Sequence, residues 1–199
     1  AETAKAALGL VNDKVEKLPV SAMIFTHSHV DHFAGVRAMV DDADVKSGKV
    51  PLIAPEGFME EAVSENVFAG TAMSRRASYM YGNLLPKDPK GTVSGGLGIT
   101  TAAGTITLLE PNKLIEKTGE TLTVDGIEVV FQMAPGTEAP AEMLFYFPQF
   151  KAIDLAEDGN HTLHNILTLR GAKVRSAQKW ASALGQTIDL WGADAVVSF

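Results

Sequence analysis

The chain has 199 residues, of which 46% are hydrophobic and 21% charged, enough for one domain with a buried core. Its formal net charge of −7 argues against a nucleic-acid surface, because phosphate recognition needs a basic stripe. No apolar run approaches the roughly 18 residues that cross a membrane, and the absence of cysteine excludes disulfides, thiolate metal sites and a cysteine nucleophile.

The first part of the chain alternates predicted helices and strands. Residues 3–18 place apolar side chains on one side of a helix, and residues 20–26 form a short apolar run typical of a buried strand. A polar turn rich in histidine occupies residues 27–32. A helix at 34–41, a short strand at 51–54 and a long helix at 56–81 follow.

The second part is richer in strands. Residues 82–104 contain many glycines and prolines and predict a long loop. Strands are then predicted at 106–110, in a hairpin at 121–133, at 142–148 and at 151–156. Residues 156–192 are mostly helix or loop, and 195–199 form a last strand, so residues 1–199 make one domain. Because the chain ends inside this apolar strand, we expect it to be truncated.

The strongest chemical signal is Thr26-His27-Ser28-His29-Val30-Asp31-His32, directly after the first predicted strand. Three of the five histidines of the chain and one carboxylate lie within it. Imidazole and carboxylate groups suit zinc, and alternate residues of an extended turn, His27 and His29, point to one side. Asp31 and His32 then face a second ion. A single bound ion and a chance polar loop are the two weaker interpretations.

This string, with a strand before it and a helix after it, resembles the metallo-β-lactamase superfamily. That resemblance implies an α/β protein with a metallo-β-lactamase-like αββα sandwich and its metals at the sheet edge. The superfamily places a further ligand after a Pro-Gly pair, where this chain has Glu138 in APGTEAPAEMLFYFP. It places a bridging carboxylate after a later strand, where this chain has Glu157 in AEDGNHTLHNILTLRGAKVR.

Two Glu residues at these places resemble the alkylsulfatase branch, the zinc-dependent alkyl sulfatases. The resemblance covers nearly the whole chain. It implies two Zn²⁺ ions, one held by His27, His29 and Glu138, the other by Asp31, His32, Glu157 and a histidine beyond residue 199. Glu142 and Asp158 are nearby competitors as ligands, and Asp154 would be the bridging carboxylate if the register were shifted.

The substrate side is expected in the segment after Glu157. A sulfate ester needs hydrogen-bond donors and positive charge, which His164, Arg170 and Arg175 can provide. Thr101 in the glycine-rich loop is a further candidate sulfate ligand, and Asp31 and His164 are the candidate catalytic residues. Each arginine is alternatively a solvated side chain, and one of the pair His161 and His164 alternatively caps or packs.

The resemblance implies hydrolysis of an alkyl sulfate ester to an alcohol and inorganic sulfate by a hydroxide that two zinc ions activate. It also implies N-terminal strands and C-terminal dimerisation and lipid-carrier-like domains outside this chain, a homodimeric parent protein, and a periplasmic or secreted location. Attack at sulfur and attack at carbon both remain open. The alternatives are another hydrolase of the same fold, acting on a thioester, lactone or β-lactam, and an inactive fragment that only binds metal.

Overall fold

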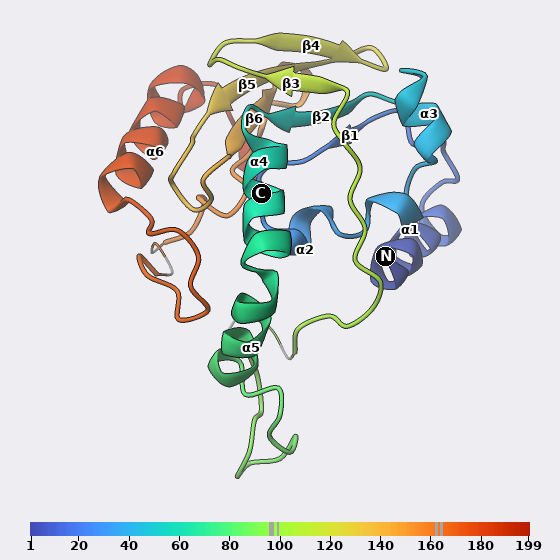
Figure 1. The fold of residues 1–199 in the computed structure, drawn as a ribbon. Helices are drawn as coiled ribbons and strands as arrows, with labels where there is room; N and C mark the ends of the chain where they lie inside the picture. The colour runs from blue at the N-terminus through green and yellow to red at the C-terminus, as the bar shows by residue number, and fades with distance from the viewer. Residues whose placement is uncertain (96–97, 99, 162, 164) are drawn as a thin grey trace.

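Two β-sheets lie face to face between two layers of helices in the computed structural model, which describes residues 1–95, 98, 100–161, 163 and 165–199 (Figure 1). The first sheet is parallel and consists of β1 (Met23–Ile24), β2 (Leu52–Pro55) and β3 (Lys113–Ile115). The second sheet pairs β4 (Thr121–Val124), β5 (Ile127–Met133), β6 (Met143–Phe147), β7 (Ala152–Asp154) and β8 (Val197–Ser198) in that order, antiparallel except for β7 with β8.

Alternation of side chains along β2 shows how the layers are held together. Leu52 and Ala54 pack in a cluster with Phe58 and other residues of the helical layer, whereas Ile53 packs against Phe131 and other residues of the second sheet. All four residues of β2 are apolar and buried, as expected for a strand that is covered on both faces. The αββα sandwich expected from the sequence is therefore confirmed.

The helices lie on opposite sides of the two sheets (Figure 1). On the side of the first sheet are α2 (Val30–Phe33), the 3₁₀ turn η1 (Val36–Ala38), α3 (Asp42–Lys46) and α4 (Phe58–Val63), with α1 (Glu2–Lys14) against η1. Helix α6 (Ala177–Trp191) covers the second sheet, where Ala183 packs near Leu144 and Trp191 stacks on Tyr146. Helix α5 (Gly70–Met80) extends away from the sheets, and no described helix is long and apolar enough to cross a membrane.

Several predicted elements are confirmed with small shifts. The first helix ends at Lys14 rather than at residue 18, and β2, β6, β7 and β8 lie within or beside the predicted strands. The hairpin of β4 and β5 turns through Asp125 and Gly126, which have φ angles of 51° and 79°. Positive φ at both central residues is the requirement of the two-residue hairpin turn that an Asp-Gly pair favours.

Three predictions of secondary structure are wrong in detail. Of the helix predicted at 34–41 only the 3₁₀ turn η1 forms, with α2 ending before residue 34 and α3 beginning after residue 41. At Gly35 the backbone lies so close to α1 that a Cβ would be 2.6 Å from that of Ala4. The strand predicted at 106–110 is not part of a sheet; the Thr107 amide instead donates to the carbonyl of Ala34 at 3.0 Å. The helix predicted at 56–81 is α4 and α5 joined by a π-helical segment, η2 (Ser64–Phe68).

Candidate metal centre

The end of β1 is joined to the start of β6, and this contact brings the histidine turn to the edge of the sandwich. His27 forms an isolated antiparallel bridge with Glu142, the Met143 amide donates to the carbonyl of Thr26 at 2.9 Å, and the Ser28 amide donates to that of Ala141 at 3.2 Å. His27 therefore lies beside the turn that connects β5 with β6.

That turn carries Glu138, and it is built around a buried carboxylate. Gly136 has a φ of +76°, a backbone angle that residues with a side chain rarely adopt. Its amide donates a hydrogen bond to the carbonyl of Ala139 at 2.8 Å. One oxygen of Glu142 accepts hydrogen bonds from the Thr137 hydroxyl at 2.8 Å and from the amides of Glu138 and Ala139 at 3.0 and 2.6 Å. Glu142 thus fixes the backbone on which Glu138 stands.

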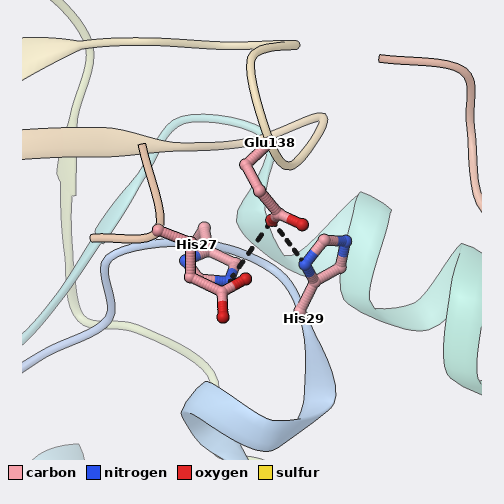
Figure 2. Close-up of side chains that lie close together, drawn as sticks. His27, His29 and Glu138 are labelled. Atoms are coloured by element: carbon pink, nitrogen blue, oxygen red, sulfur yellow. Dashed lines mark ion pairs between the residues drawn. The ribbon is translucent and has the colours of Figure 1, made fainter. Parts of the chain in front are cut away.

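Glu138 points at two histidine rings (Figure 2). Its Oε2 lies 2.7 Å from Nδ1 of His29 and 3.7 Å from Nε2 of His27, and Oε2 of Glu157 lies 4.0 Å from the same His27 nitrogen. One donor atom from each of these four residues lies within 4.8 Å of the others. The side chains of His27 and Glu138 are 0% and 1% exposed, so the group is closed off from solvent on this side.

A second group of donors adjoins the first. His32, in the short helix α2, places Nε2 3.5 Å from Oε1 of Glu157 and 3.7 Å from Oδ2 of Asp31. The two oxygens of Glu157 therefore face different donor groups, an arrangement suited to a carboxylate that bridges two cations. This second group is open to solvent, since the Asp31 side chain is 73% exposed.

Glu157 reaches the histidines because the chain turns sharply after β7. Ala156 has a φ of +50°, rare for a residue other than glycine, and its amide donates to Oδ1 of Asp154 at 2.8 Å. Such backbone conformations are retained where the surroundings fix them, and they are common at functional sites. Asp154 therefore stabilises the turn, while Glu157 is the residue that contacts His27 and His32.

The ring nitrogens of both buried histidines have defined neighbours. Nδ1 of His27 lies 3.0 Å from the Thr26 hydroxyl, which leaves Nε2 directed at Glu138 and Glu157. His29 directs Nδ1 at Glu138, and its Nε2 lies 3.9 Å from Oε2 of Glu65. Two imidazole nitrogens from the histidine turn and a carboxylate oxygen from the β5–β6 turn form a donor set that fits zinc.

Arg175 lies against Glu138, not in an open substrate site. Its Nη2 pairs with Oε1 of Glu138, its Nε donates to the Glu138 carbonyl at 2.6 Å, and its Nη1 donates to the Asn165 carbonyl at 3.3 Å. The residue is only 8% exposed. The sulfate-binding role predicted for Arg175 remains a prediction, but its guanidinium is engaged by protein acceptors.

The other residues predicted for the substrate side are spread over two loops. Arg170 places Nη1 3.2 Å from Oε1 of Glu65, and the hydroxyl of the exposed Thr101 accepts a hydrogen bond from the side-chain Nδ2 of Asn83 at 3.2 Å. His161 is exposed, and His164 lies outside the described residues. Their roles toward a substrate are not tested by these contacts.

Two buried carboxyl groups lie behind the metal ligands. Burial raises the pKa of Glu142 well above its usual value, and the charges of Asp158 and Glu138 add to this effect. Burial likewise raises the pKa of Asp158 to about 7. Neither residue belongs to the donor groups found among the described residues. The geometry therefore favours Glu138 and Glu157 over these two competitors as metal ligands.

The pKa of His32 predicts how the metal-free protein responds to pH. Burial lowers this pKa, but the hydrogen bond to Glu157 and the charges of Asp31, Glu157 and Glu138 outweigh it, so the value is raised above 6.5. A raised folded-state pKa contributes stability that is complete below about 6.5 and is lost as pH rises through the folded value. We expect the urea midpoint of the chelator-treated protein to fall over this window, and the His32→Gln variant to lack this component of the fall. An identical slope in the two proteins would contradict the assignment.

Known proteins that are similar to this chain point to one family. A family model described as the metallo-beta-lactamase superfamily matches residues 1–196. The chain is 59% identical over 198 residues to a linear primary-alkylsulfatase of a Pseudomonas species, covering 100% of this chain and 29% of that protein. It is 49% identical over 180 residues to an alkyl/aryl-sulfatase of Saccharomyces cerevisiae, covering 90% of this chain and 28% of the other.

Among solved structures, a stereoselective inverting sec-alkylsulfatase from a Pseudomonas species superposes with a TM-score of 0.94 at 47% identity. The match covers 99% of this chain and 31% of that one. The chain therefore spans less than a third of the length of these relatives.

Proposed function

The chain belongs to the metallo-β-lactamase superfamily, and from that premise we propose that it carries the metal centre of a hydrolase that cleaves alkyl sulfate esters to an alcohol and inorganic sulfate. The observation that carries the proposal is the convergence of His27, His29 and Glu138 on one point, with Glu157 and His32 beside it. The alkylsulfatases to which the chain is 47–59% identical give the substrate class.

The donors form two sets that would each hold a zinc ion. His27, His29 and Glu138 would hold the buried one, and Asp31, His32 and Glu157 would hold the more exposed one, with Glu157 facing both donor groups. Bound in this way, the ions would supply a hydroxide nucleophile at neutral pH by lowering the pKa of water. Each set combines residues of the histidine turn with a glutamate from a later turn, Glu138 for the first set and Glu157 for the second.

The chain's own residues orient the reactants. Arg175 and Glu142 fix Glu138 from two sides, so the ligand keeps one geometry. On the substrate side, a sulfate ester carries one negative charge, and its leaving oxygen gains charge as the ester bond breaks. We assign Arg170 and Thr101 to the sulfate group, and His164 to sulfate binding or to protonation of the leaving group, which is the alcohol for attack at sulfur and sulfate for attack at carbon.

A substrate panel tests the proposal. The zinc-loaded protein is incubated with decyl sulfate below its micelle concentration, with a thioester and with a β-lactam, and sulfate, thiol and opened lactam are measured. We expect zinc-dependent release of sulfate alone, abolished in the His27→Ala variant. Turnover of the thioester or lactam without sulfate release, or bound zinc with no turnover, would overturn the proposal.

A further inference from the structure

Glu65 lies outside both donor groups, yet its carboxylate faces a candidate metal ligand and a candidate substrate-binding arginine. One carboxylate oxygen, Oε2, lies 3.9 Å from Nε2 of the metal-ligand candidate His29. The other, Oε1, lies 3.2 Å from Nη1 of Arg170, the arginine expected beside the substrate. The Glu65 side chain is 14% exposed, so these charges face one another largely shielded from water.

The position of Glu65 in the helix gives these contacts a defined geometry. Glu65 belongs to the π-helical segment Ser64–Phe68, which the Ala69 amide closes by donating to the Ser64 carbonyl at 3.0 Å. Single π turns inside α-helices occur often at functional sites, because the wider turn redirects side chains. A small cavity of about 70 Å³ adjoins Glu65 between this turn and the loop of Gly171 and Lys173.

Arg170 is fixed from its backbone as well as from its side chain. The Nε of Arg76, on α5, donates to the Arg170 carbonyl at 2.8 Å. Gly171 follows with a φ of +99°, and a Cβ there would lie 2.7 Å from the Arg76 guanidinium. The positive φ favours glycine at position 171, and a side chain there would also displace the Arg76 guanidinium that holds the Arg170 carbonyl.

His29 consequently stands between two carboxylates, each paired with an arginine. Glu138 faces its Nδ1 and pairs with Arg175, while Glu65 faces its Nε2 and pairs with Arg170. A histidine that binds metal through one nitrogen is oriented by the acceptor at the other, which fixes both the tautomer and the ring. Glu65 faces that other nitrogen at 3.9 Å, beyond direct hydrogen-bond distance, so it acts on the ring as the negative charge on that side.

We propose that Glu65 is a positioning residue that orients His29 for metal binding through Nδ1 and holds Arg170 beside the metal centre. The part that concerns His29 depends only on metal binding, whereas the part that concerns Arg170 rests on the proposed function. Neither contact could be read from the sequence, since Glu65 is one of several acidic residues in a long helical segment.

Zinc affinity measured with a competing chromophoric chelator tests the inference. Glu65→Leu removes the carboxylate at similar size, and we expect zinc to bind ~10- to 100-fold more weakly, the usual cost of losing such a partner. Glu65→Gln retains an oxygen acceptor and should lose less. The matched control is Glu61→Leu, one helical turn earlier, where the carboxylate pairs with Lys173 at 2.7 Å and should leave zinc affinity unchanged.

The outcomes separate the inference from the proposed function. A Glu65→Leu protein that stays folded by circular dichroism and binds zinc within twofold of the unmodified chain would overturn the inference, whatever the substrate. A merely structural role would lower the melting temperature of the metal-free protein and leave the zinc affinity of the folded protein intact, which also overturns it. With alkyl sulfate, KM should rise in both Glu65 variants. If the unmodified protein turns over no alkyl sulfate, the zinc result still decides the part that concerns His29.

Discussion

Glu138→Gln is expected to lower the zinc affinity on the order of 100-fold or more, because an outer partner alone is worth 10- to 100-fold and Glu138 is itself a ligand. Its Oε2 lies 2.7 Å from Nδ1 of His29 and 3.7 Å from Nε2 of His27, the two histidine nitrogens of the same donor group. The amide that replaces it is neutral and a poorer ligand, and it removes the charge that offsets a divalent cation. Metal content after dialysis and a chelator titration measure the change.

The matched control for this variant lies on β5, the strand that leads into the Glu138 turn. Glu128→Gln makes the same chemical change on β5, where the side chain is exposed, and should leave zinc binding as it is. Gln at 138 still offers an oxygen to Arg175, so the variant should fold. Zinc occupancy equal to that of the unmodified protein would remove Glu138 from the ligand set.

Arg175→Met is expected to destabilise the metal-free protein by ~3 kcal/mol or more, the usual cost of leaving a buried ion unpaired. Arg175 pairs with the Glu138 carboxylate and donates to its carbonyl, and the two residues are 8% and 2% exposed. Without the guanidinium, a buried carboxylate remains among buried carboxyl groups. Zinc should recover part of the loss, because a bound cation compensates the same carboxylate. Urea unfolding with chelator and with excess zinc gives both values.

A double variant separates this ion pair from general loss of packing. Glu138→Gln combined with Arg175→Met removes both charges, and such a replacement is often close to neutral, so it should be more stable than Arg175→Met alone. The exposed Arg75→Met on α5 is the control and should change stability little. A double variant as unstable as the sum of the two single ones would show that Arg175 acts through its packing instead.

Much of this centre could be predicted because its ligands are read from short-range patterns. A buried strand followed by alternating histidines places His27 and His29 on one side of a turn whatever the rest of the chain does. Glu138 and Glu157 were predicted from family resemblance and strand order. The structure brings both within 4 Å of a histidine nitrogen, through the turns at Gly136 and Ala156.

The parts that escaped prediction depend on contacts between distant segments. Arg175 was expected to be open to a substrate, but its distance from Glu138 is set by how the loop before α6 folds over the β5–β6 turn. Glu65 depends on a π turn, which leaves no pattern in the sequence because helical periodicity continues on both sides. The helix predicted at 34–41 is reduced to η1, and the close approach of α1 to Gly35 in this segment is a tertiary contact that helical periodicity does not record.

Anomalous diffraction at the zinc absorption edge, from crystals of the zinc-loaded protein, tests the central claim most directly. We predict an anomalous peak within coordination distance of Nε2 of His27, Nδ1 of His29 and Oε2 of Glu138. A second peak is expected nearby, between His32 and Oε1 of Glu157. Zinc located elsewhere, or bound to the histidines with Glu138 turned away toward Arg175, would contradict it.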